Sequence, residues 1–392
     1  MAATKIKQIM ASNTHYILHK RHQHNLNQIK NILNRNNLTV AIADKNKALV
    51  IINKDSLEEK VKTFIHENRI AGLNKDPTDS FQKQIQQALQ QCPPLIEKSR
   101  HKYLINIKPT APNLNAYIKT HKEGEPIRPV IYNTQAPSCK LAKFLNKKLQ
   151  SLIDLLNIHT TKKNSYEVAQ ELHDIQISEH NRKITLDIKD LYVNLPTKNI
   201  LRIIEIWLNG RNHDPIITEQ VLCLLKIIFK QGYLQYNNQF HQPSNGITMD
   251  SPTSGTLAEI YLQYLEEIFV KHCLENKEIA HYKRYVDDLL IVFDQNKINT
   301  DTIYSMINNI DKHLELKISQ EKNNTINCLH LSVNRIANSI ELNIYRKPTC
   351  IYITIHFTSS HPFDQKLAAF IFYTYINRIT TLPITEQAKK QE

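Results

Sequence analysis

The sequence predicts an α+β fold in which an antiparallel sheet packs on helices, and three stretches carry this prediction. Residues 281–293 hold two β-like runs on either side of Asp287 and Asp288, which is the pattern of two strands joined by a tight acidic turn. Residues 183–189 alternate apolar and polar side chains, as a half-buried strand does. Apolar residues recur over 257–269 at the three- and four-residue spacing of an amphipathic helix.

The composition favours a polyanionic partner. The 392 residues include 50 Lys and Arg against 37 acidic residues, a formal net charge of +13, which favours nucleic acid before a membrane surface, although any basic protein can carry such an excess. The six cysteines form no Cys-x-x-Cys pair, so we expect neither a zinc site nor a disulfide framework. Reduced thiols predict an intracellular location, and no apolar run approaches the roughly 18 residues of a membrane span.

The first 97 residues are predicted to form a basic N-terminal extension. Residues 1–40 are polar, with Ile and Leu at helical spacing. Two short β-like runs, 39–43 and 48–52, predict a hairpin, and 55–74 has helical character.

A second hairpin is expected around Gly124. Residues 116–122 and 126–131 have the character of two strands, so Lys119, Lys122 and Arg128 would lie close together on one hairpin. Three cations on a rigid element can hold a triphosphate, but an ordinary basic hairpin is the alternative.

A basic helix follows this hairpin. Apolar residues keep helical spacing over 141–156, and Lys140, Lys143 and Lys147 fall on another face of the same helix. Such a face is either a solvated surface or one that follows a phosphate backbone.

Three carboxylates are predicted to converge. Asp187 lies near the end of its strand, on the face opposite the apolar residues, and it can meet Asp287 and Asp288 if both elements belong to one antiparallel sheet. Three ionised carboxylates need a counter-charge, and Mg²⁺ is the natural one because it prefers oxygen ligands. Two such ions would support an in-line displacement at a phosphoryl group. The alternative is that the Asp pair is a solvated turn.

The long helix is predicted to begin directly after a glycine-containing loop. In the loop that starts at Gly246, Ser251 suits an N-cap and Pro252 the first helical position.

The order of these blocks resembles the reverse transcriptases of Penelope-like retroelements, from about Ala41 to Pro383. The resemblance is carried by short motifs, each weak alone but found in the same order: Ala43-Asp-Lys, Asp76-Pro-Thr78, Lys119-Thr-His-Lys122 with Pro126-Ile-Arg-Pro129, Leu141-Ala-Lys-Phe-Leu145, Leu186-Asp-Ile-Lys-Asp-Leu-Tyr192, Met249-Asp-Ser-Pro252 with Leu257-Ala-Glu-Ile-Tyr-Leu262, Tyr285-Val-Asp-Asp288, Tyr345-Arg-Lys-Pro-Thr349 and Ser360-His-Pro362.

The resemblance implies a right-hand polymerase with fingers at 98–180, a palm at 181–362 and the start of a truncated thumb at 363–392. The palm would contain an antiparallel sheet packed on helices and a helical insert at 197–230. The implied activity is that of an RNA-directed DNA polymerase, a nucleotidyltransferase with two Mg²⁺ ions. Its partners would be an RNA template, a DNA primer and dNTPs, and its location nuclear.

The resemblance also implies roles for individual residues. The catalytic and metal-binding carboxylates would be Asp187, Asp287 and Asp288, with the backbone carbonyl of Ile188 as a further metal ligand. The nucleotide-binding residues would be Lys119, Arg128, Tyr192 and Met249, although Tyr192 also suits an ordinary core position. The contacts to template and primer would be Lys122, Lys140, Lys143, Lys147, Gly246, Ser251 and Tyr285.

One departure from the family pattern lies close to these residues. Asp250 stands where the family has Gly in Met-Gly-Ser-Pro, and a carboxylate about 5 Å from a triphosphate would be repelled by about 3 kcal/mol at an effective dielectric of about 20. Asp250 would instead help to cap the following helix if it points away. The alternative function is therefore a nucleic-acid-binding relic that no longer polymerises. The sequence contains no Gly-Ile-Tyr or Tyr-Ile-Gly, so we expect no GIY-YIG endonuclease and no DNA-nicking activity.

Overall fold

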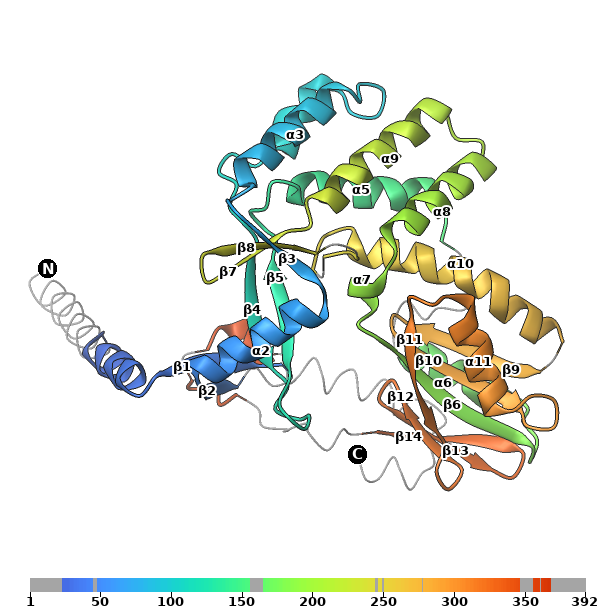
Figure 1. Cartoon of the computed structure of the whole chain (residues 1–392). Coiled ribbons are helices and arrows are strands. Elements are labelled where there is room, and N and C mark those ends of the chain that lie inside the picture. The colour runs from blue at the N-terminus through green and yellow to red at the C-terminus, as the bar shows by residue number, and fades with distance from the viewer. Residues whose placement is uncertain are drawn as a thin grey trace, which may run out of the picture. The chain divides into compact units, whose positions relative to one another are not determined.

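The structure is a computed structural model that describes residues 23–44, 48–155, 165–243, 246–248, 250–276, 278–345, 355–359 and 361–367 (Figure 1). The chain divides into two compact units. Unit 1 comprises Met1–Arg69 and Asn115–Val130, and unit 2 comprises Ile70–Leu114 and Ile131–Glu392. Within the described ranges, no helix has the length and apolar character that a membrane crossing requires.

Unit 1 is built around two hairpins. β1 (Leu38–Ala43) and β2 (Leu49–Asn53) pair antiparallel, which confirms the predicted first hairpin. The second hairpin consists of β4 (Asn113–Ile118) and β5 (Ile127–Tyr132), and β1 runs parallel to β4 with Ala43 opposite Ile118. The helix α2 (Lys54–Glu67) begins where the Asn53 side chain accepts hydrogen bonds from the first backbone N–H groups.

The central element of unit 2 is a four-stranded antiparallel sheet. Its strands follow the order β11 (Glu315–Gln320), β6 (Asn181–Lys189), β10 (Asp288–Asp294) and β9 (Ile279–Tyr285) (Figure 1). The interior of β10 is buried throughout, which explains its unbroken run of Leu, Ile, Val and Phe.

Both faces of this sheet are covered. On one face, Leu289 and Ile291 belong to the same core as Leu257 of α10 (Ser254–Glu275) and Ile303 of α11 (Thr300–Ile310). On the other face, the alternate β10 residues Leu290 and Val292 pack with α6 (Ser165–Asp174) and with a second, three-stranded sheet. That sheet consists of β12 (Thr325–Cys328), β13 (Leu331–Ile336) and β14 (Ser339–Ile344).

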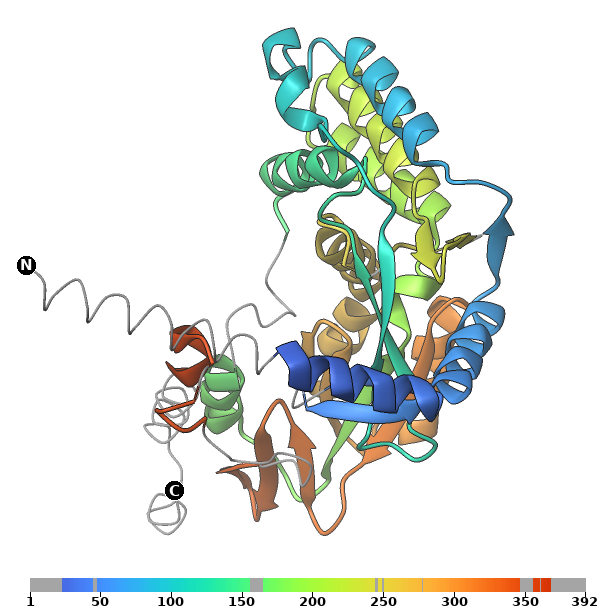
Figure 2. The ribbon, with the colours of Figure 1, turned by 90° about the vertical axis from the view of Figure 1, so that its left-hand side faces the viewer.

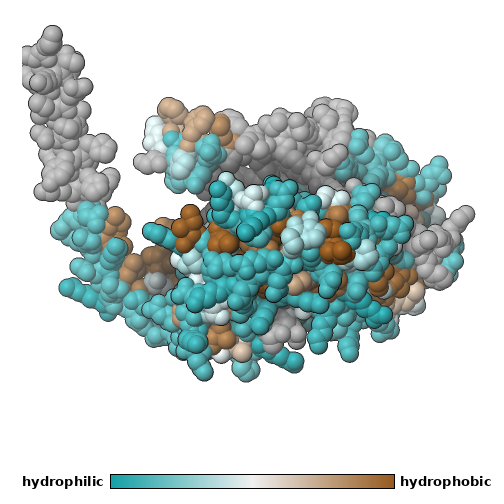
Figure 3. Space-filling view, turned by 90° about the horizontal axis from the view of Figure 1, so that it is seen from above, coloured by the Kyte–Doolittle hydropathy of each residue, from teal (hydrophilic) through white to brown (hydrophobic). Residues whose placement is uncertain are grey.

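Most of the remaining helices of unit 2 share one hydrophobic core with α10. The remaining helices are α3 (Thr78–Gln90), the 3-10 helix η1 (Lys98–Arg100), α4 (His101–Leu104), α5 (Cys139–Leu152), α7 (Leu191–Asn194), α8 (Thr197–Gly210) and α9 (Pro215–Lys230). Figures 1 and 2 show α3 and α9 side by side. Just beyond the end of α9, Tyr233 makes an edge-to-face contact with Phe81 of α3, with ring centroids 5.1 Å apart. Three short strands, β3 (Ile70–Leu73), β8 (Gln239–Pro243) and β7 (Leu234–Tyr236), pair in that order. Hydrophilic residues cover most of the described face in Figure 3.

The α+β prediction is confirmed, but three helix boundaries are wrong. The helix with apolar spacing over 141–156 is α5, which ends at Leu152 because Ile153 is extended. The helix expected over 55–74 ends at Glu67, because Arg69 takes a left-handed φ of 50° and the chain continues into β3. The long helix starts at Ser254 rather than at Pro252. The Ser254 amide donates to Ser251 (3.0 Å) in a tight turn, and the first α-helical bond runs from Leu257 to Thr253 (3.0 Å).

The predicted division into extension, fingers, palm and thumb stays a prediction. The expected insert at 197–230 holds the helices α8 and α9. Within the range predicted as the start of the thumb, residues 363–367 are helical, and the rest lies outside the described residues.

Candidate active site

Asp187 and Asp288 are direct partners across the antiparallel pairing of β6 with β10. Partners in such a pair have Cβ atoms about 5 Å apart and point to the same face of the sheet. Both residues are exposed, while their neighbours Leu186 and Leu289 are buried. The prediction that the strand and the acidic turn belong to one antiparallel sheet is therefore confirmed.

Asp287 lies in the tight turn between β9 and β10. Tyr285 pairs with Asp288, which leaves Val286 and Asp287 as a two-residue loop. The Asp287 carbonyl accepts a hydrogen bond from the amide of Ile188 (3.0 Å), the residue after Asp187. This bond ties the turn to β6 and keeps all three aspartates at one end of the sheet.

The carboxylate oxygens at this end of the sheet suit a hard divalent cation. Like charges directly opposite each other are unfavourable in a sheet, so Asp187 and Asp288 favour a counter-cation, and carboxylate oxygens are the ligands that Mg²⁺ prefers. Within the described residues, however, no group of three or more His, Cys, Asp or Glu side chains is already arranged to hold a metal ion. The carboxylates therefore fit Mg²⁺ by chemistry and register, and the metal assignments stay predictions.

Lys317 is a site residue that the sequence analysis missed. It is the direct partner of Asp187 on the other side, in the pairing of β11 with β6, and it is exposed. Asp187 thus lies between a carboxylate and an ammonium group on one face of the sheet. The alternation around Leu316 places Lys317 on the polar face of a strand, but the sequence does not reveal which strand it pairs with.

A buried thiol lies near the aspartates. Burial raises the pKa of Cys328 to about 12, and the negative charge of Asp288 adds to this shift. The thiol is therefore neutral at physiological pH.

The loop at Gly246 is tied to the residues that follow Asp187. Gly246 has a φ of 83°, and a Cβ added there would lie 2.1 Å from the Val193 carbonyl oxygen, so this position requires glycine. The next residue, Ile247, donates its amide to the Tyr192 carbonyl (2.8 Å). Tyr192 itself is half-buried and packs against the main core, which agrees with its alternative interpretation and leaves its nucleotide-binding role a prediction.

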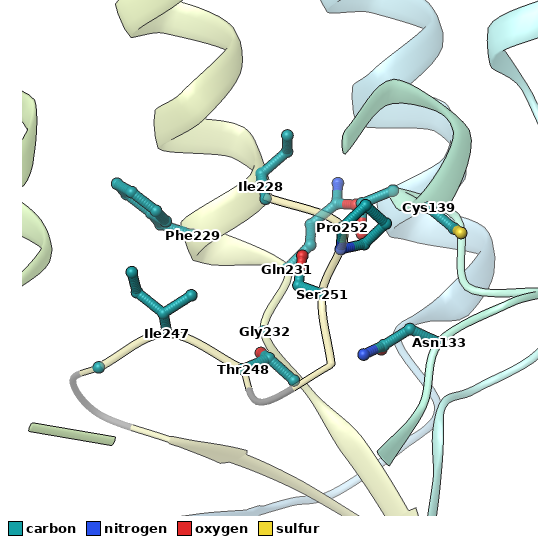
Figure 4. A pocket seen from close by; sticks show the side chains of 12 residues that line it. Asn133, Cys139, Ile228, Phe229, Gln231, Gly232, Ile247, Thr248, Ser251 and Pro252 are labelled. Carbon is teal, nitrogen blue, oxygen red and sulfur yellow. The ribbon is translucent and has the colours of Figure 1, made fainter. Parts of the chain in front are cut away.

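The same loop lines a pocket (Figure 4). Ile247, Thr248, Ser251 and Pro252 of the loop face residues from the end of α9 and from the start of α5, including Cys139. A Cβ on Gly232 would meet the Thr248 hydroxyl at 2.7 Å, so glycine permits this approach as well. Met249 lies outside the described residues.

Asp250 occupies a backbone conformation that favours glycine. Its φ is 68°, in the left-handed region, and its side chain is exposed. The Gly of the family pattern would take this conformation without strain.

Three predicted phosphate-binding cations lie on the β4–β5 hairpin of unit 1. Lys122 is in the turn, Lys119 donates its amide to the Pro126 carbonyl (2.9 Å), and Arg128 is on β5. Arg128 Nη1 lies 3.1 Å from Asp44 Oδ1, with side-chain exposures of 49% and 4% respectively. The sequence analysis names Asp44 only within a motif. It does not predict the contact with Arg128, which lies 84 positions away.

The remaining predicted contacts are on unit 2. Lys143 and Lys147 are exposed on α5, whereas Lys140 is half-buried and donates to the Ile105 carbonyl (3.0 Å). Tyr285 is 41% exposed beside the acidic turn.

The paired aspartates lie at the end of the β9–β10 hairpin, on an antiparallel sheet that is backed by two helices, as in a polymerase fold. Residues 120–356 match the family described as reverse transcriptase (RNA-dependent DNA polymerase), and the chain belongs to this family.

Solved structures of telomerase share the fold. Apo telomerase from Candida tropicalis, truncated from the C-terminal domain, superimposes with a TM-score of 0.52 at 11% identity, over 81% of this chain and 65% of that one. The telomerase of the same organism in complex with a fragment of telomeric RNA gives a TM-score of 0.53 at 12% identity, over 93% of this chain and 59% of that one. The chain thus spans about three fifths of the length of these relatives. None of the curated proteins matches it.

Proposed function

We propose that the chain is the RNA-directed DNA polymerase of a Penelope-like retroelement, which transfers a nucleotide from a dNTP to a primer 3′-hydroxyl. The observation that carries the proposal is the register of β6 and β10, which sets Asp187 opposite Asp288 while the Ile188 amide holds the turn that contains Asp287. Membership of the reverse transcriptase family supports the same reaction.

The proposed chemistry depends on the three aspartates. Asp187, Asp287 and Asp288, with the Ile188 carbonyl, would hold two Mg²⁺ ions, which when bound stabilise charge on the attacking and leaving oxygens. Lys317, the partner of Asp187 on β11, would add positive charge beside the reacting phosphates.

The other predicted residues would bind the substrates. Lys119 and Arg128 would bind the triphosphate, and Arg128 retains N–H groups beyond the Nη1 that contacts Asp44. Tyr192 would stack beneath the sugar and disfavour a 2′-hydroxyl. Gly246 and Ser251 would contact the nucleotide and the template.

The partners in this proposal are an RNA template, a DNA primer and dNTPs, within the nucleus. The net charge of +13 and the exposed Lys143 and Lys147 of α5 support contact with a phosphate backbone. The telomerase neighbour in complex with a fragment of telomeric RNA supports RNA as a partner.

One observation favours a second function. Asp250 is exposed, in a conformation that suits glycine, on the loop that would approach the nucleotide. A chain impaired by this charge would be a relic that binds template and primer but does not polymerise.

Extension of a labelled DNA primer on an RNA template, with Mg²⁺ and all four dNTPs, tests the proposal. The polymerase proposal predicts full-length product, and a second reaction on a DNA template of the same sequence measures template preference. A relic would form no product but would still bind the same duplex. Its affinity for the duplex would fall steeply between 50 and 200 mM salt. A chain that neither binds nor extends the duplex contradicts both functions.

A further inference from the structure

A buried ion network lies directly beneath the acidic turn. Arg284 is on β9, and its side chain is only 1% exposed. Its Nε lies 2.6 Å from Glu266, whose side chain is 6% exposed, and its Nη2 lies 2.9 Å from Glu259, whose side chain is 21% exposed. Both glutamates are on α10, so the network connects this helix to the strand that leads into the turn.

The same guanidinium also contacts the turn itself. Arg284 Nη1 donates to the carbonyl oxygen of Val286 at 3.2 Å, in addition to Glu259 at 3.1 Å. Val286 has a φ of 55°, which is rare for a β-branched residue because its side chain crowds the backbone there. The carbonyls of Val286 and Asp287 are therefore both held, one by Arg284 and the other by the Ile188 amide.

Burying the charges of this network carries a desolvation penalty in free energy. Burial alone would lower the pKa of Arg284, but Glu266 and Glu259 raise it overall, so the guanidinium stays charged. The Tyr282 hydroxyl donates to Glu266 at 2.8 Å and completes the cluster. Apolar side chains of similar volume often stabilise a core at least as well as a buried ion network. A geometric role explains why the charges are present.

We propose that Arg284 is a positioning residue for catalysis: held by Glu259 and Glu266 of α10, it fixes the Val286 carbonyl and thereby the turn that presents Asp287 and Asp288. This inference rests on the proposed polymerase function. It adds a link between α10, which follows the Asp250 loop, and the carboxylates that would hold the metal.

Arginine suits this role better than lysine. Its planar guanidinium carries five N–H donors, and here three nitrogens reach Glu266, Glu259 and Val286 at once. A lysine ammonium keeps the charge but has a single nitrogen at the end of a flexible chain. Arg284→Lys therefore separates charge from geometry.

The test compares Arg284→Lys and Glu259→Gln with the control Lys183→Met. Lys183 is also 1% exposed in the same sheet and is paired with Glu321 at 2.7 Å, but it is the partner of Val292, four residues along β10 from Asp288. Lys183→Met therefore removes a buried ion pair from this sheet without touching the turn. All variants are measured at a temperature below their thermal unfolding midpoints.

Three readouts are taken: the single-turnover rate of nucleotide addition, Mn²⁺ affinity from the loss of the free-ion paramagnetic resonance signal, and hydrogen exchange of peptides covering 285–288. We expect Arg284→Lys to lower the rate and the Mn²⁺ affinity about tenfold each and to speed exchange at the turn, with little change in KM for dNTP. Lys183→Met lowers only the unfolding midpoint.

The inference is overturned if Arg284→Lys behaves like Lys183→Met, with lower stability but unchanged rate, Mn²⁺ affinity and local exchange. If the wild type does not polymerise, the proposed function fails, and Mn²⁺ affinity and exchange at 285–288 still decide the inference. If Arg284→Lys does not fold, Glu259→Gln decides by the same criteria, because it loosens Arg284 without removing it.

Discussion

The β-carbons of Asp187 and Asp288 are neighbours on one face of the sheet, because the two residues are partners in the pairing of β6 with β10. Their charges repel each other unless a cation lies between them. We therefore predict that a divalent metal ion stabilises unit 2.

Mg²⁺ or Mn²⁺ is therefore expected to raise the thermal unfolding midpoint of the wild type. At ten times its Kd, a single bound ion adds about 1.4 kcal/mol to the free energy of unfolding. Asp288→Asn should be more stable than the wild type without metal, by about 0.2–1 kcal/mol, and should lose most of the metal response. Differential scanning fluorimetry measures both effects. Asp190→Asn, at a nearby exposed aspartate outside the pair, is the control, and an equal metal response in both variants would contradict the prediction.

Gly246→Ala is expected to disrupt the loop that approaches Tyr192. The new Cβ would overlap the Val193 carbonyl oxygen, and the positive φ alone costs about 1–3 kcal/mol. Nucleotide addition should fall at least tenfold as the loop moves. Gly255→Ala is the matched control: a Cβ there meets no described atom within 4 Å, and alanine in α10 should stabilise the fold by up to about 1 kcal/mol. Urea unfolding and primer extension report the two changes.

Substitution of Asp250 separates charge from backbone strain. Asp250→Asn removes the charge and keeps a residue that tolerates the left-handed region, whereas Asp250→Gly removes both the charge and the strain. Because electrostatic repulsion is the expected defect, both variants should lower KM for dNTP severalfold. Steady-state kinetics at varied dNTP test this. An unchanged KM in Asp250→Asn together with a lower one in Asp250→Gly would assign the defect to the backbone instead.

Unit 2 is expected to lose stability in acid through His281. Burial lowers the pKa of His281 to about 4 from an ordinary 6.5, and outweighs the attraction of Glu171, whose oxygen lies 3.9 Å from the ring nitrogen. Between these two values the unfolded chain binds a proton that the folded chain does not, so stability falls as the pH drops from about 6.5 to 4, by on the order of 3 kcal/mol. Urea unfolding at pH 7 and pH 4.5 should show a smaller loss for His281→Gln than for the wild type. Equal losses would contradict the assignment.

The sequence predicts the elements that have a strong periodicity. The alternation over 183–189 and the apolar run after Asp288 predict β6 and β10, and the acidic turn between β9 and β10 follows from them. The convergence of Asp187 with Asp288 was predictable because both occupy strand ends beside turns.

The missed features depend on pairings between distant segments. Arg284 lies in the short β-like run before Asp287, and its burial depends on the two glutamates of α10. Lys317 lies beside Asp187 because β11 pairs with β6. Asp44 meets Arg128 because β1 pairs with β4. The start of α10 was misplaced because Ser251 and Pro252 suit a tight turn as well as a helix N-terminus.

The most direct test of the central claim is single-nucleotide addition to a DNA primer on an RNA template by the wild type, Asp287→Asn and Asp190→Asn. Asp190 is exposed, lies three residues after Asp187, and has a left-handed φ of 48° that asparagine tolerates. A catalytic Asp287 predicts addition by the wild type and by Asp190→Asn, and at least a thousandfold slower addition by Asp287→Asn. Equal rates for Asp287→Asn and the wild type, or no addition by any of the three proteins, would contradict the account.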